Sequence, residues 1–134
     1  MSPDPLGSIR RALQVEPVLI FLGGPNCAGK STFFEAFLAQ LGLPFVNADR
    51  IALAVREADP AARQAEVDRR AFEQAERFRS DFVDAGVSFC TESVFSDPVG
   101  AKVGALQTAQ SKGFAVFLIF IGLDTPSLSA ARVH

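Results

Sequence analysis

Residues 18–23 read VLIFLG, and residues 24–32, which follow directly, read GPNCAGKST. The apolar run predicts a buried strand, and the second stretch contains the pattern G-x-x-x-x-G-K-[ST]. A glycine-rich turn between a strand and a helix directs backbone N–H groups at one anion, and the helix N-terminus adds partial positive charge. Lys30 suits the outer phosphates of a nucleotide and the Ser31 hydroxyl suits its magnesium ion, so the stretch predicts a site for ATP and Mg²⁺. The expected nucleotide-binding residues are Gly24, Pro25, Asn26, Cys27, Ala28, Gly29, Lys30, Ser31 and Thr32.

Length and composition limit what surrounds this loop. With 134 residues, 49% of them apolar, the chain is expected to form a single domain at 1–134, with 1–15 as an N-terminal extension. A formal net charge of −2 does not favour a nucleic-acid partner. Two cysteines do not make a disulfide framework, and we find no signal peptide and no apolar stretch of membrane-spanning length. We therefore expect a cytoplasmic protein that does not act on a membrane.

Apolar runs alternate with helical patterns along the rest of the chain. Strands are expected at 18–23, 45–47, 87–92 and 115–121. Helices are expected at about 30–41, over a long region broken at Asp59-Pro60, at about 98–111, and after Thr125-Pro126 up to the chain end. This alternation predicts an α/β fold of the three-layer P-loop NTPase or kinase type. Its parallel sheet of about four strands has helices on both faces.

Two carboxylates follow strands of this expected sheet, at the edge where ligands bind in such folds. Asp49 comes just after the second strand, where it could accept the proton of an attacking hydroxyl or only cap the next helix. Glu92 closes the third strand, where it could bind an acceptor, hold magnesium through water, or be only a solvated strand end.

Other polar residues carry weaker signals. Ser96 or Asp97 suits the cap of a helix that begins at Pro98. Arg132, on the expected last helix, could face the site or solvent. Cys27 stands at a variable position of the loop and is interpreted as a tolerated small residue. The chain lacks a Leu-Ser-Gly-Gly-Gln-like signature and an apolar strand ending in Asp-Glu, which argues against a transporter ATPase and favours a small-molecule kinase.

Several blocks together resemble the zeta toxin family over about residues 16–133. They are the loop region 21–34, then FVNADRIA at 45–52, TESVFS at 91–96, KGF at 112–114, IGLDTP at 121–126 and ARV at 131–133. The best-known members phosphorylate a hydroxyl of UDP-N-acetylglucosamine at the expense of ATP. The resemblance implies Asp49 as the base, Lys30 as the phosphate clamp, and Arg132 as a stabiliser of charge. It also implies Ser31 on magnesium, Asp49, Glu92 and Ser96 in the acceptor site, and an antitoxin protein as a partner.

The chain departs from this family pattern in three ways. Cys27 replaces the glycine common at that position of the loop, and only four strands are visible where kinases of this class usually show five. The sequence also stops at His134, before the arginine-bearing lid segment that the family adds. Arginines that stabilise a transferring phosphoryl group are worth 10³–10⁵ in rate in other enzymes. Two alternatives therefore stay open: a nucleotide-binding module with impaired catalysis, and a kinase of another acceptor.

Overall fold

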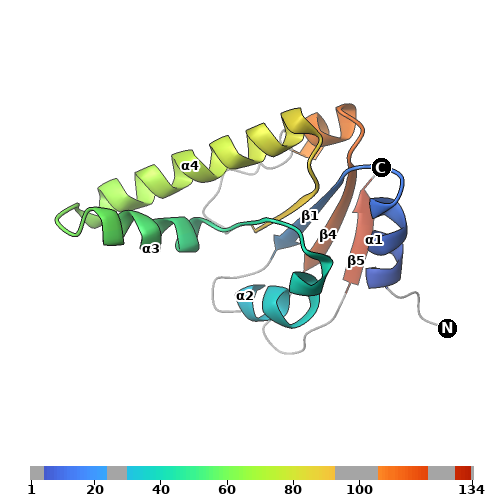
Figure 1. Cartoon of the computed structure of the whole chain (residues 1–134), viewed down its shortest axis with the longest axis horizontal. Coiled ribbons are helices and arrows are strands. Elements are labelled where there is room, and N and C mark those ends of the chain that lie inside the picture. Colours follow the sequence, from blue (N-terminus) through green and yellow to red (C-terminus); the bar gives the residue numbers. More distant parts are fainter. Residues whose placement is uncertain (1–4, 24–29, 93–105, 121–128, 134) are drawn as a thin grey trace.

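A computed structural model describes residues 5–23, 30–92, 106–120 and 129–133, and its centre is a five-stranded sheet (Figure 1). The strands are β1 (Val18–Gly23), β2 (Phe45–Val46), β3 (Phe89–Glu92), β4 (Ala115–Phe120) and β5 (Ser129–Val133). They lie in the order β2-β3-β1-β4-β5. The first four are parallel, as the sequence predicts, and β5 pairs with β4 in the antiparallel direction.

Helices connect and cover these strands. They are α1 (Pro5–Leu13), α2 (Lys30–Phe33), α3 (Ala48–Ala58) and α4 (Gln64–Ala85), and residues 106–111 are also helical. The segment expected as one helix at 30–41 continues from α2 as a π-helix, η1 (Phe34–Leu38), and a 3₁₀ turn, η2 (Ala39–Leu41). Gly42 and Gly86 end their helices with φ of 71° and 69°, a left-handed conformation that glycine adopts without steric cost.

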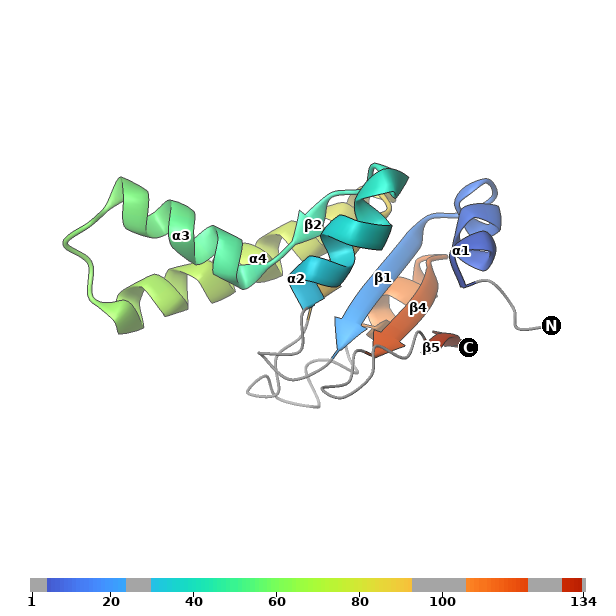
Figure 2. The ribbon, with the colours of Figure 1, turned by 90° about the horizontal axis from the view of Figure 1, so that it is seen from below.

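Each face of the sheet carries its own apolar layer, because successive side chains of a strand point to opposite faces. Val18, Ile20 and Leu22 of β1 pack with residues of α1, α2 and η1 on one face. Leu19 packs with residues of α4 and of the helical segment 106–111 on the other face. The molecule therefore has three layers, and β1 is covered on both sides (Figure 2).

Helices α3 and α4 form a long hairpin that projects beyond the sheet (Figures 1 and 2). Charged side chains form ion pairs on its exposed surface. Glu66 pairs with Arg69 and Arg70, and Arg70 also pairs with Asp59 in the connecting turn. The two arginines lower the pKa of Glu66. Among the helices that the structure describes, none has the length and apolar content needed to cross a membrane.

The structure corrects the sequence-based prediction at the C-terminal end of the fold. Ser129–Val133 is strand β5, so the expectation of a last helix carrying Arg132 is wrong, and the sheet gains a fifth strand. At the other end, the N-terminal segment forms α1. Its Ile9 and Ala12 are buried against the core, whereas Arg10 and Arg11 are exposed.

Candidate active site

The pairing of β2, β3 and β1 brings their carboxyl ends together at one edge of the sheet. Glu92, the last residue of β3, lies opposite Leu22 of β1. Thr91, one position earlier, lies opposite Val46, the last residue of β2. The phosphate loop follows β1, and Asn47 and Asp49 follow β2. The strands that precede the phosphate loop and Asp49, and the strand that ends at Glu92, are therefore adjacent and end at nearly the same level of the sheet, with β3 in the middle.

The elements on each side of the phosphate loop agree with its predicted role. Residues 24–29 lie outside the described part of the chain, but β1 ends at Gly23 and α2 begins at Lys30. Lys30 and Ser31 thus occupy the first turn of a helix, where the sequence pattern requires them for a nucleotide and Mg²⁺. Thr32 is exposed on the same turn. Among the described residues, no group of three His, Cys, Asp or Glu side chains could hold a metal ion.

Asn47, and not Asp49, performs the capping role that the sequence left open for Asp49. Asn47 caps α3, because its Oδ1 accepts hydrogen bonds from the backbone N–H groups of Asp49 at 2.8 Å and Arg50 at 3.2 Å. Asp49 is the second residue of α3, and its side chain is exposed. Arg50 turns away to pair with Glu35 and lies over the rings of Phe34 and Phe45. Asp49 is therefore not the helix cap, and its carboxylate is accessible at the edge of the sheet.

Glu92 is buried, with 7% of its surface exposed. The alternative that it is only a solvated strand end is therefore wrong. Burying a carboxylate is costly unless partners stabilise its charge.

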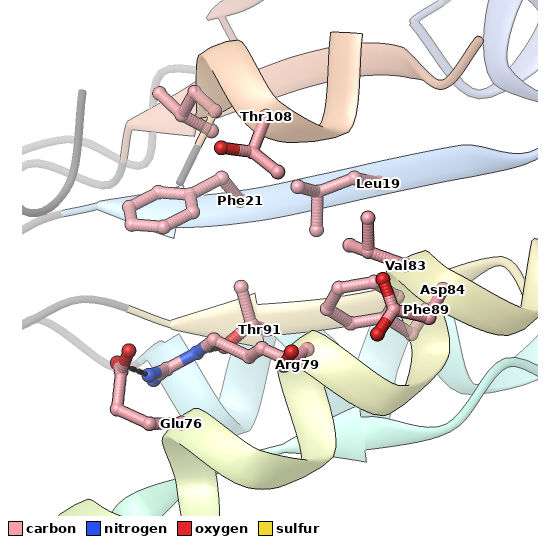
Figure 3. Close-up of a pocket in the computed structure, with 11 residues that line it drawn as sticks. Leu19, Phe21, Glu76, Arg79, Val83, Asp84, Phe89, Thr91 and Thr108 are labelled. Carbon is pink, nitrogen blue, oxygen red and sulfur yellow. Dashed lines mark hydrogen bonds and ion pairs between the residues drawn. The ribbon is translucent and has the colours of Figure 1, made fainter. Parts of the chain in front are cut away.

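Arg79, on α4, is the site residue that the sequence analysis missed. Its Nε donates a hydrogen bond of 2.8 Å to Thr91 Oγ1, and one of its terminal nitrogens approaches the backbone carbonyl of Glu92 at 3.4 Å. The other terminal nitrogen pairs with Glu76 (Figure 3). A signal for it exists in the sequence, because Arg79 continues the four-residue spacing of the buried Val67, Ala71 and Ala75.

A cavity of about 160 Å³ lies beside Arg79, between α4 and the helical segment 106–111. Leu19 and Phe21 of β1 and Phe89 of β3 form its apolar wall, and Thr91 and Thr108 add hydroxyl groups (Figure 3). Cys90, the neighbour of Thr91, is buried in the layer on the other face of the sheet. Burial raises the pKa of its thiol to about 12, so the thiol stays protonated and unreactive at neutral pH.

Arg132 is not brought to this edge by its backbone. It pairs with Phe117 of β4, and Phe117 pairs with Ile20, in the middle of β1. Strand β5 also lies at the opposite border of the sheet from β2. Ser96 lies outside the described residues.

Comparison with protein families assigns almost the whole chain, residues 7–134, to the zeta toxin model. The chain belongs to the zeta toxin family. No curated protein matches it at a significant level. Among the solved structures that resemble this zeta toxin family member, two are compared with it, and at their identities the likeness shows the fold. A candidate kinase from Chloroflexus aurantiacus has a TM-score of 0.64 and 21% identity over 78% of this chain and 59% of its own.

The second structure belongs to the PezAT chromosomal toxin–antitoxin system of Streptococcus pneumoniae. It has a TM-score of 0.63 and 18% identity, over 91% of this chain and 58% of its own. The zeta toxin family chain described here thus spans somewhat more than half the length of both structures. Their resemblance confirms the three-layer α/β fold of the P-loop type.

Proposed function

We propose that this zeta toxin family member is a P-loop kinase that transfers the γ-phosphate of ATP to a hydroxyl of a small molecule, a UDP-N-acetyl sugar. The observation that supports it best is the register of β2, β3 and β1, which places Asp49, Glu92 and the start of the phosphate loop at adjacent strand ends. The family supplies the expectation for the acceptor.

In the proposed reaction, the acceptor oxygen forms a bond to the γ-phosphorus as the bond from that phosphorus to the β–γ bridging oxygen breaks. ADP leaves, and the acceptor proton passes to the exposed carboxylate of Asp49. Ser31 would hold a magnesium ion, which would neutralise charge on the phosphates. Lys30 binds the outer phosphates, and Glu92 orients the acceptor from the neighbouring strand end. Asn47 holds Asp49 in the first turn of α3 through its own two hydrogen bonds.

The experiment is incubation of the chain with Mg·ATP and UDP-N-acetylglucosamine, followed by mass spectrometry of the sugar nucleotide. Phosphorylated product is expected from the parent chain and from Asp81→Asn, a control at an exposed aspartate of α4. The Asp49→Asn variant should form no more product than the Lys30→Ala variant, which serves as the negative control. Absence of product from the parent would contradict this function.

The same experiment separates the two alternatives. Product with a different hydroxyl acceptor, and none with UDP-N-acetylglucosamine, would identify a kinase of another substrate. Saturable ATP binding without transfer to any acceptor would identify a nucleotide-binding module that acts through a partner. An antitoxin protein is the partner that we propose on the strength of the family, and co-purification with the product of a neighbouring gene would test it.

A further inference from the structure

Arg79 is a charged residue on the buried face of α4. Val67, Ala71 and Ala75 precede it at intervals of four residues, and each is at most 2% exposed. The Arg79 side chain is itself 17% exposed. The side chain is thus partly buried, and partners of its guanidinium group offset the cost of the hydration that the charge loses. The partners of Arg79 therefore indicate why the sequence has arginine here.

Those partners connect three elements of the site. Arg79 Nε donates to Thr91 Oγ1 of β3 at 2.8 Å, and the same hydroxyl donates to the carbonyl of Val46 in β2 at 3.1 Å. A threonine hydroxyl can accept one hydrogen bond while it donates another, so the two bonds are compatible. Glu76, one turn earlier on α4, pairs with the guanidinium group and fixes its orientation (Figure 3). The result is a continuous link from α4 through β3 to β2.

This link ends beside Glu92 and beside the start of the helix that carries Asp49. Thr91 directly precedes Glu92, and Arg79 also approaches the Glu92 carbonyl at 3.4 Å. Val46 directly precedes Asn47, whose side chain holds the first turn of α3 where Asp49 lies. A shift of the end of β3 relative to β2 would therefore change the separation of Glu92 and Asp49. In catalysis, a misplacement of 1 Å can cost ~100-fold in rate.

We propose that Arg79 is a positioning residue, which acts through Thr91 to hold the end of β3 against β2 and so sets the geometry of Glu92 and Asp49 toward the acceptor. The inference rests on the proposed kinase function. It explains why arginine is required rather than lysine, because the planar guanidinium group donates in several fixed directions, whereas an ammonium group presents one nitrogen.

The test compares Arg79→Lys, Thr91→Val and the double variant with Arg77→Lys, a control at an exposed arginine on the same helix. We expect kcat/KM for the acceptor to fall by ~10- to 100-fold in each single variant. The KM for ATP should remain that of the parent, because the link does not include the phosphate loop. The double variant should lose little more than either single variant, since both remove the same link. An equal loss in Arg77→Lys, or additive losses in the double variant, would overturn the proposal.

A second measurement does not depend on activity. Amide hydrogen exchange in residues 89–92 should be faster in Arg79→Lys than in Arg77→Lys, while exchange in β4 stays the same. Equal exchange in the two variants would show that Arg79 does not hold β3. A parent chain without any transfer contradicts the kinase function and the acceptor part of this inference, whereas the exchange result still decides whether Arg79 positions the strand.

Discussion

Asn47 determines how α3 begins and therefore where Asp49 lies. It is 1% exposed, and its Oδ1 accepts two backbone hydrogen bonds of the first turn. We expect Asn47→Ala to lower the free energy of unfolding by about 1–2 kcal/mol, because the cap is lost in a buried position. Asn47→Ser keeps an acceptor oxygen and should fall between the parent and the alanine variant.

Urea unfolding followed by circular dichroism measures these differences. Equal stability of the alanine variant and the parent would show that the cap contributes nothing. Equal losses in the serine and alanine variants would show that packing, and not the hydrogen bonds, is the cause.

At the level of single residues, the sequence located groups better than it assigned their roles. Asp49 and Glu92 could be found because parallel strands are apolar and a carboxylate at their end is conspicuous. The capping role was attached to Asp49, although Asn47 performs it, because both residue types favour that position. Arg79 was missed, although it continues the four-residue spacing of the buried Val67, Ala71 and Ala75. Its hydrogen bond to Thr91 joins residues 12 positions apart, a contact that no local pattern contains.

At the level of elements, β5 shows where sequence periodicity fails. Residues 129–133 read SAARV, of which only the last is β-branched, and alanine and arginine favour helices. Pairing with β4 overrides this local preference. Strands β1 and β4 could be predicted because each is a continuous apolar run, and such runs mark strands buried on both faces. An edge strand with one neighbour is not buried in this way, so its sequence carries a weaker signal.

Proline substitution distinguishes a strand from a helix at β5. Ala130 and Ala131 pair with Ile119 and Leu118 of β4. Neighbouring N–H groups of an edge strand point alternately toward and away from its single partner. We therefore expect one of Ala130→Pro and Ala131→Pro to lower the melting temperature clearly and the other to have a smaller effect. Thermal unfolding with Ala130→Gly and Ala131→Gly as controls measures the difference. Equal, large losses at both positions would indicate a helix.

At the level of the whole molecule, the sheet order explains how a short chain assembles the site. Strand β1 lies between β3 and β4 and is buried on both faces, so the phosphate loop leaves from the most enclosed part of the fold. Strand β3 then separates β1 from β2, so that Glu92 ends a strand whose neighbours are β1 on one side and β2, which Asn47 and Asp49 follow, on the other. In the proposed function, nucleotide and acceptor therefore bind at this one edge of the sheet. Helix α4 covers β3 on one face of the sheet.

Nucleotide binding should therefore stabilise the whole molecule. A ligand that binds only the folded chain raises the free energy of unfolding by about 2.7 kcal/mol at a concentration of 100 times its Kd. For a chain of this size, that corresponds to an increase in melting temperature on the order of 10 °C. Calorimetry with Mg·ATP should show this increase in the parent and in Asp49→Asn, whose substitution leaves the phosphate loop intact, but not in Lys30→Ala. If the parent does not respond, or Lys30→Ala responds equally, the loop is not the nucleotide site. If Asp49→Asn responds but transfers no phosphate, nucleotide binding and proton transfer are carried by separate strand ends of the same sheet edge.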